Sequence, residues 1–321
     1  MNRTMRLLGI VVVAFMVTAV LLTEAWAEKK IGILMWSEEG RYKGARDGIM
    51  EQLAKGGFKE GTAKFIVENA GGNKVKAAEL AKKFAESKLD MIIPIGTSAA
   101  VAVAKDIKDV PIVFSMVYDP VESKIAQDWK SSGNNTTGAS PRVPMSKLLA
   151  ELKNLAPVKR LGVLYTPGEK NSEIQLKELQ AEEATSGVKV IPVPLTKKED
   201  AVRMVSDAAG TVDALYLTGS SMVGAAISAI TEAASKERII TVSHLDDMVE
   251  KGAILAVCAD SFAVGSLAGE KAAKVLKGAS PSSVPIESLK KLDVIVNMKA
   301  AKAAQIKIPP AFMKSVTKTI Q

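Results

Sequence analysis

The chain of 321 residues contains one cysteine and one histidine. An intramolecular disulfide needs two cysteines, so the fold is held by its core without such a bond. Cys258 ends the apolar run 254–258, and we expect it to be a small core residue. His244 stands 14 residues before it, and one such pair does not repeat the ligand spacing of a zinc site. We therefore expect no metal site.

Catalytic motifs are also missing. The sequence contains neither a Gly-x-Ser-x-Gly elbow nor a phosphate-binding Gly-x4-Gly-Lys-Ser/Thr loop. Its acid pairs, such as Glu38-Glu39 and Asp246-Asp247, are adjacent in sequence, and adjacent side chains on a helix or strand point apart. These absences indicate a protein that is not an enzyme and needs no cofactor.

Long hydrophobic runs are limited to residues 7–22. Two arginines precede this run, and Ala25-Trp26-Ala27 follows it with small residues at the −3 and −1 positions of a cleavage site. This order predicts a secretory signal peptide over residues 1–27, which is removed. A membrane anchor is the alternative, but about 20 apolar residues are needed to span a bilayer. Because no cysteine near the cleavage site could accept a lipid, we expect a free periplasmic protein.

The sequence has no surplus of acidic residues: its net charge is +8, and +7 without the predicted signal peptide. A basic balance can indicate binding to nucleic acid. Here the lysines alternate with glutamate and alanine over stretches such as 74–83, which is typical of a solvated amphipathic helix. We expect no nucleic-acid partner.

The sequence does contain a regular alternation of apolar strand-like runs and helical periods from residue 30 almost to the end, which is typical of parallel sheets covered by helices. The first set of predicted strands is 31–36, 64–68, 91–95, 110–116 and 136–139, with helices at 43–55, 74–87 and from 97. The second set is 160–165, 189–193, 213–218, 238–243 and 253–259, after a helix at 145–155. The sequence therefore predicts an α/β protein with two doubly wound parallel-sheet lobes.

The remaining C-terminal segment is too short for a third domain. It consists of a predicted helix at 263–277, a short piece at 284–286, a strand at 292–297 and a helix at 311–316. These pieces most simply return the chain to the first lobe and then to the second. We predict an N-terminal lobe of 28–140 plus 260–287 and a C-terminal lobe of 141–259 plus 288–321, joined by a multi-strand hinge.

Candidate binding residues follow the strands, because ligands of open parallel sheets bind beyond the carboxyl ends of the strands. Thr97 and Ser98 open a helix whose free N–H groups could hold a carboxylate, although an ordinary helix cap has the same pattern. Asn171 and Ser172 open a helix in the second lobe, with the same two interpretations. Four aromatic residues at strand ends could sandwich a flat or apolar ligand or could simply pack: Trp36, Tyr118, Tyr165 and Phe262.

Several motifs resemble one family. The weaker ones are Pro94-Ile95-Gly96-Thr97-Ser98, Asp119-Pro120-Val121 and Asn134-Asn135-Thr136-Thr137-Gly138; the specific ones are Tyr165-Thr166-Pro167-Gly168-Glu169-Lys170-Asn171-Ser172 and Asn297-Met298-Lys299-Ala300-Ala301. In this order, over residues 30–315, the sequence resembles ABC transporter substrate-binding proteins similar to the tryptophan/tyrosine-binding group. The resemblance implies a type I periplasmic binding protein fold. It also implies one small molecule held between the lobes and delivered to an inner-membrane ABC permease, which a separate ATPase drives.

The resemblance further implies a set of cleft residues. They are Trp36, Thr97, Ser98 and Asp119 from the first lobe, Tyr165, Glu169, Asn171 and Ser172 from the second, and Asp260 and Phe262 at the crossing. Thr218 and Ser220, which follow the strand 213–218, complete the predicted ligand-binding set.

The sequence departs from the family at two of these places. Thr218-Gly219-Ser220 stands where relatives commonly have Thr-Asp-Asn, so a carboxylate that could meet an α-ammonium is missing. Ser261-Phe262 replaces a Tyr-Tyr pair. Both changes bear on an amino-acid ligand and leave the role in import intact.

The function predicted from the sequence is a monomeric, periplasmic solute-binding component of an ABC importer. Its predicted ligand is an aromatic or apolar amino acid or a related carboxylate. A sensor subunit that reports ligand occupancy to a membrane receptor is the first alternative, and a periplasmic enzyme on the same scaffold is the second.

Overall fold

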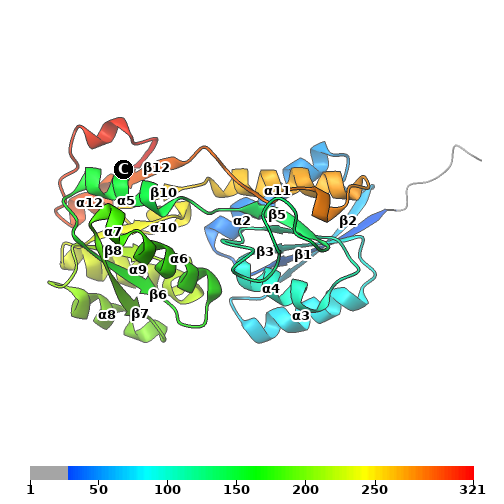
Figure 1. Cartoon of the computed structure of the whole chain (residues 1–321), viewed down its shortest axis with the longest axis horizontal. Coiled ribbons are helices and arrows are strands. Elements are labelled where there is room, and N and C mark those ends of the chain that lie inside the picture. Colours follow the sequence, from blue (N-terminus) through cyan, green and yellow to red (C-terminus); the bar gives the residue numbers. More distant parts are fainter. Residues whose placement is uncertain (1–27) are drawn as a thin grey trace, which may run out of the picture.

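The computed structural model describes residues 28–321, which form two lobes side by side (Figure 1). The predicted signal peptide, residues 1–27, lies outside the described residues. From residue 28 onward, none of the helices combines the length and the apolar character that crossing a bilayer requires.

The first lobe is built on a six-stranded sheet in which all pairs are parallel. In spatial order its strands are β11 (Glu287–Ser288), β5 (Thr136–Ser140), β4 (Ile112–Ser115), β3 (Met91–Ile95), β1 (Lys29–Met35) and β2 (Ala63–Asn69). Every residue of β3, β4 and β5 is buried. Strands that are buried over their whole length are expected where helices cover both faces of a parallel sheet.

Four helices complete the first lobe: α2 (Gly40–Lys55), α3 (Lys74–Glu86), α4 (Thr97–Asp106) and α11 (Ser261–Leu276). Helices α2 and α11 pack at backbone contact through glycines. A Cβ atom added at Gly265 would lie 2.0 Å from the carbonyl oxygen of Ala45, and one added at Gly48 would lie 2.1 Å from that of Phe262. These glycines bring a helix from late in the sequence onto the first lobe.

The second lobe contains a seven-stranded sheet. In spatial order its strands are β13 (Lys318–Ile320), β12 (Asp293–Asn297), β10 (Leu255–Cys258), β9 (Ile240–Ser243), β8 (Ala214–Leu217), β6 (Arg160–Tyr165) and β7 (Lys189–Pro194). Its helices are α5 (Met145–Leu155), α6 (Lys170–Ala181), α7 (Glu183–Ser186), α8 (Ala201–Ala208), α9 (Ser221–Lys236), α10 (Asp246–Glu250) and α12 (Met298–Ala303).

Two strands of this sheet run opposite to the other five: β12, which was expected to be parallel, and β13, which is parallel to β12. Strand β12 is antiparallel to β10, with Asp293 opposite Cys258. The chain reaches β12 from the other lobe, so β12 starts at the edge of the sheet where β10 ends. The second sheet is therefore mainly, but not wholly, parallel.

The predicted helix at 311–316 is wrong. A single 3₁₀ turn, Phe312–Lys314, occupies this stretch and is followed by β13. Pro309 and Pro310 precede the turn, and the N–H of Thr317 then donates to the carbonyl of Val294, which draws the chain into the sheet.

Within residues 28–321 the chain changes lobe three times. It crosses between β5 and α5, between β10 and α11, and between β11 and β12. Three crossings form a multi-strand hinge at the waist visible in Figure 1. The exact boundaries between the lobes stay a prediction.

Candidate functional site

The two lobes touch directly where the carboxyl ends of their strands face each other. The indole N–H of Trp36 donates to Ser221 Oγ at 2.8 Å, and Lys74 Nζ donates to the carbonyl of Gly168 at 2.8 Å. Tyr118 OH donates to Glu178 Oε2 at 2.6 Å. Each bond joins one lobe to the other, so the lobes are closed.

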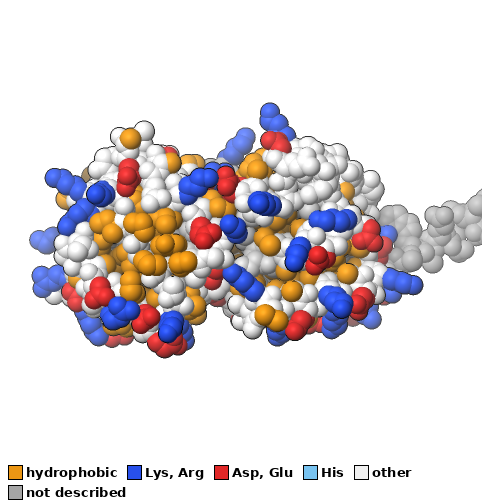
Figure 2. Space-filling model, turned by 60° about the horizontal axis from the view of Figure 1, so that its bottom comes forward, with side chains coloured by type: hydrophobic (Ala, Val, Ile, Leu, Met, Phe, Trp, Pro, Cys, Tyr) orange, Lys and Arg blue, Asp and Glu red, His pale blue; other side chains and the backbone are white. Residues whose placement is uncertain are grey.

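Two small cavities lie between the lobes and share Tyr42, Thr97, Asn171 and Gly219 in their linings. The larger has a volume of about 20 Å³, which is room for about one water molecule. A ligand of amino-acid size therefore has to displace flexible side chains, such as Met116, or widen the angle between the lobes. Charged side chains of both signs gather along the boundary of the lobes on the face shown in Figure 2.

The first turn of α4 points at these cavities. Gly96, just before it, has a φ of 103°, and an added Cβ would lie 2.9 Å from Trp36 Cβ, so only glycine fits this position. Thr97 and Ser98 line the cavities, and Thr97 Oγ1 accepts a hydrogen bond from the N–H of Tyr118 at 3.2 Å. The N–H groups of a first helical turn have no partner within the helix, which suits a carboxylate.

Glu169 faces α4 from the second lobe and is the one carboxylate in the linings of these two cavities. Its Oε2 accepts a hydrogen bond from the N–H of Ser221 at 2.8 Å. Burial raises the pKa of Glu169 above its ordinary value, although the bond from Ser221 acts in the opposite direction. A positive group placed beside Glu169 would favour its charged form.

His244 belongs to a buried polar network in the second lobe. Its Nδ1 lies 2.7 Å from Tyr216 OH, and its Nε2 lies 3.5 Å from Gln175 Nε2. Gln175 Oε1 in turn accepts a hydrogen bond from the N–H of Gly219 at 3.0 Å. Burial lowers the pKa of His244 to about 3, so its ring is neutral at neutral pH. Together with Tyr118, whose ring lies edge-on to His244 at 5.1 Å, the network gives this part of the cleft an uncharged polar wall.

A cluster of charges closes the same side of the cleft. Arg41 of α2 is buried and bonds to Asp247 of α10, with Nη1 at 3.1 Å from Oδ1 and 3.0 Å from Oδ2. Its Nη2 also forms an ion pair with Glu39. Burial opposes the charge of Arg41, but the attraction of Asp247 leaves its pKa well above the ordinary value. Arg41 is therefore charged, and its charge is balanced by Glu39 of the first lobe and Asp247 of the second.

Of the predicted site residues, the structure brings Trp36, Thr97, Ser98, Glu169 and Asn171 together around the cavities. They come from both lobes and follow three different strands, β1, β3 and β6. Asn171 also holds the neighbouring backbone of its own lobe, since its Nδ2 donates to the carbonyl of Gly219 at 2.6 Å.

Three predicted residues instead lie inside the second lobe. Ser172 Oγ accepts from the N–H of Thr166 at 2.7 Å, and Thr218 Oγ1 donates to the carbonyl of Leu164 at 2.8 Å. Ser220 caps α9, accepting from the N–H of Val223 at 3.0 Å. These hydroxyls support the ends of β6 and β8 from behind the cavity walls.

The four other predicted residues lie outside the linings of the two cavities. Asp119 pairs with Arg142 at 2.9 Å, and Asp260 caps α11 and pairs with Lys318 at 3.2 Å. Tyr165 is half-buried and packs on the core of the second lobe, while Phe262 on α11 is 40% exposed.

Other lining residues were not in the predicted set. Arg41 and Tyr42 lie in the first turn of α2, and Gln175 lies one turn after Asn171 on the same face of α6. The spacing of four residues from Asn171 was the available signal for Gln175. His244 and Met116 do follow strands, as the strand-end rule requires.

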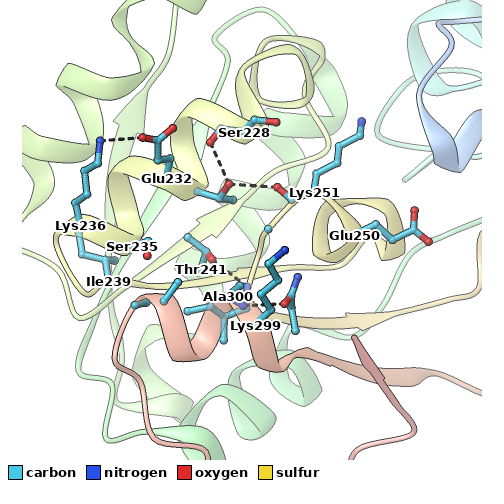
Figure 3. Close-up of a pocket in the computed structure, with 16 residues that line it drawn as sticks. Ser228, Glu232, Ser235, Lys236, Ile239, Thr241, Glu250, Lys251, Lys299 and Ala300 are labelled. Atoms are coloured by element: carbon cyan, nitrogen blue, oxygen red, sulfur yellow. Dashed lines mark hydrogen bonds and ion pairs between the residues drawn. The ribbon is translucent and has the colours of Figure 1, made fainter. Parts of the chain in front are cut away.

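A much larger cavity lies elsewhere, in the second lobe between α9 and α12 (Figure 3). Its volume is about 550 Å³. Thr241 and Ile254 on its floor lie near the amino ends of β9 and β10, at the opposite end of the sheet from the cleft. Its buried polar groups have partners within the protein: Thr231 bonds to the carbonyls of Ser228 and Lys251 at 3.2 Å. Charged side chains, among them Glu250, Lys251 and Lys299, also line this cavity, which is separate from the cleft between the lobes.

Comparison with known proteins gives consistent matches over nearly the whole chain. The model of the family described as "ABC transporter substrate binding protein" matches residues 30–320. A protein named "Tyrosine-binding protein" from Clostridioides difficile is 28% identical over 283 residues, covering 88% of this chain and 82% of the relative.

Two solved structures differ in how well their shape matches. A protein from Streptococcus pneumonia in complex with L-Trp is 26% identical, with a TM-score of 0.87 over 92% of this chain and 100% of that chain. The ligand-free, open structure of a substrate-binding protein from Clostridium difficile is 30% identical, yet its TM-score is 0.71, over 91% of this chain and 99% of that chain. The present lobes thus match the L-Trp complex better despite the lower identity, in agreement with their direct contacts.

Proposed function

This chain belongs to the ABC transporter substrate-binding proteins, with the type I periplasmic binding protein fold, and from this premise we propose that it captures a small molecule between its lobes for an ABC importer. It would act outside the cytoplasm and hand its ligand to a permease in the membrane. The observation that carries the proposal is the composition of the cleft: the residues around the two cavities come from both lobes, so a ligand that touches both favours closure.

The ligand that we propose is an aromatic amino acid or a closely related carboxylate. The first turn of α4 suits the carboxylate, and Glu169 across the cleft suits an α-ammonium in place of the carboxylate missing at Gly219. Trp36 and Tyr42 supply aromatic faces beside these groups. Support comes from two relatives, one named for tyrosine binding and one solved with L-Trp.

For the moving parts, we propose that residues 28–140 plus 260–287 and residues 141–259 plus 288–321 act as two rigid bodies. The three crossings would carry the bending.

Thermal unfolding with a panel of the common amino acids and small aromatic carboxylates tests the proposal. A ligand that binds only the folded state raises the unfolding temperature, so L-Trp, L-Tyr or L-Phe is expected to raise it in a concentration-dependent way. Thr97→Ala and Glu169→Gln should weaken the affinity measured by calorimetry by about tenfold or more, which corresponds to about 1.4 kcal/mol.

Thr185→Ala is the matched control, because Thr185 is an exposed residue of α7 outside the linings of both cavities. It should bind like the wild type. Equal affinities for Thr97→Ala, Glu169→Gln and wild type would move the site away from this cleft. If no member of the panel binds, the proposed class of ligand is wrong.

A further inference from the structure

We propose that Glu39, Arg41 and Asp247 form a charge lock, seated on Gly40 and Gly224, that holds the two lobes closed and so sets how long the cleft retains its ligand. This inference rests on the proposed function, because retention has meaning only for a protein that captures a ligand. Glu39 and Arg41 belong to the first lobe, and Asp247 and Gly224 belong to the second.

The lock joins the lobes with several bonds from one side chain. Arg41 Nη1 donates to both oxygens of Asp247, at 3.1 and 3.0 Å, and the backbone N–H of Arg41 lies 3.4 Å from Asp247 Oδ2. Arg41 Nη2 pairs with Glu39. The side chains of Arg41 and Asp247 are only 2% and 4% exposed. A buried pair in which one guanidinium nitrogen contacts both carboxylate oxygens depends on one geometry, so it forms fully only when the lobes are closed.

Two glycines leave the space into which the charges fit. A Cβ atom at Gly224 would lie 2.2 Å from Glu39 Oε1 and 3.2 Å from Arg41 Nη2. One at Gly40 would lie 3.2 Å from Asp247 Cβ. Neither glycine has a positive φ, so neither is required by the backbone conformation. The absence of a side chain at Gly40 and Gly224 therefore allows the two lobes to approach each other closely.

Substitution of Gly224 can test the closure of the lobes without weakening the fold of the second lobe. It lies in the first turns of α9, where alanine is a better helix former than glycine. The atoms that an added methyl group would strike, on Glu39 and Arg41, belong to the other lobe. Gly224→Ala should therefore leave the second lobe as stable as before, or more so, while it obstructs the closed arrangement.

The experiment measures small-angle scattering and ligand dissociation for wild type, Gly224→Ala, Glu39→Ala and the double variant. Each protein is first unfolded and refolded to strip any co-purified ligand, and L-Trp is the probe. Without added ligand, Gly224→Ala should have a larger radius of gyration than wild type, with an equal or higher unfolding temperature. With L-Trp it should bind at least about tenfold more weakly, mainly through faster dissociation.

The double variant Gly224→Ala/Glu39→Ala removes the main obstruction and should return the radius of gyration to that of Glu39→Ala alone. Gly44→Ala on α2 is the matched control, since its added methyl group would meet nothing nearer than 3.6 Å and only atoms of its own lobe. It should close and bind like the wild type.

Two results would overturn the lock. One is a Gly224→Ala protein with the same radius of gyration as wild type without ligand; the other is a Gly224→Ala protein that binds L-Trp as tightly as wild type or more tightly. If the wild type binds no member of the ligand panel, the proposed function fails, but the comparison without ligand still decides whether the lock closes the lobes.

Discussion

At the scale of single residues, the cleft combines neutral polar groups with charges that the protein itself neutralises. His244 is the clearest neutral group, because its ring is buried between Tyr216 and Tyr118. Arg41 is the clearest neutralised one, flanked by Glu39 and Asp247. An uncharged wall and a self-neutralised charge cluster together leave the first turn of α4 and Glu169 as the groups that a ligand's own charges can meet.

The first prediction at this scale concerns pH. The pKa of His244 is about 3 in the folded protein and 6.5 for an unperturbed histidine, so the unfolded chain binds a proton over a range in which the folded protein does not. Stability contributed by neutral His244 is therefore fully present above about pH 6.5 and is lost as the pH falls toward 3. By about pH 5 the loss amounts to about 2 kcal/mol.

Urea unfolding of wild type and His244→Gln, at pH 7 and at pH 5, measures this loss. Glutamine cannot take up the proton, so the wild type should lose about 2 kcal/mol more than the variant between the two pH values. The comparison between proteins is needed because Glu39, Glu169 and Asp246, whose pKa values are raised by burial, act in the opposite direction. Parallel losses in the two proteins would contradict a neutral, buried His244.

The sequence predicted where the site lies better than it predicted which residues line it. Residues in the segments that follow strands, such as Trp36, Thr97 and Asn171, were found because the carboxyl ends of parallel strands meet at one edge. Arg41 and Gln175 were missed because they lie further along α2 and α6, beyond the short segments after the strands from which the candidates were taken. Ser172 and Thr218 follow strands as well, but their hydroxyls turn inward to backbone groups, a choice that no local pattern encodes.

At the scale of elements, the packing of α2 on α11 ties the late part of the chain to the first lobe. Their contact is close because Gly48, Gly265 and Gly269 each face backbone atoms of the other helix. A side chain at any of these positions would have to push the helices apart. Helices separated by about 200 residues are thus joined by glycine positions that the sequence pattern did not single out.

Gly265→Ala tests this packing. The added Cβ would overlap the carbonyl of Ala45 at 2.0 Å, and backbone cannot move aside as a flexible side chain can. We expect a loss of about 1–3 kcal/mol or more in the free energy of unfolding, despite the better helix propensity of alanine. Gly44→Ala, four residues before Gly48 on α2, should be neutral or stabilising in the same urea titration. Equal stability of Gly265→Ala and wild type would show that the helices are not in backbone contact.

Most elements could be predicted from periodicity, and the misses have local causes. Strand β3 was predicted at its observed bounds because its apolar run is sharply delimited. The three residues of β13 carry too little pattern to be told from a loop, and the sequence after Pro310 suggested a helix instead. The antiparallel direction of β12 follows from the path between lobes, which periodicity does not record.

At the scale of the whole molecule, a single C-terminal segment, which follows β10, completes both lobes. The segment after β10 supplies α11 and β11 to the first lobe and β12 and β13 to the second. Lys318 on β13 pairs with Asp260 and Asp293, at 3.2 and 2.9 Å, and so fixes the last strand beside two of the crossings. Neither lobe is therefore a continuous piece of chain.

Shortening the chain checks this dependence. A protein of residues 28–259 lacks α11 and β11 from the first lobe and β12 and β13 from the second. Both sheets then lose strands at one edge, and α2 in the first lobe loses the helix that packs on it, α11. We expect it to show no cooperative unfolding transition by circular dichroism, whereas residues 28–321 should show one. A cooperative transition in the shorter protein would mean that its lobes fold without the returning segment.

The three crossings also govern when the chain can fold. Contacts between α2 and α11, or between β5 and β11, join residues far apart in sequence, and such contacts form slowly because a long loop must close first. During synthesis, neither sheet can be finished before the strands that follow residue 260, in about the final fifth of the polypeptide, have emerged. We therefore expect a growing chain of this protein to complete neither lobe until its synthesis is almost finished.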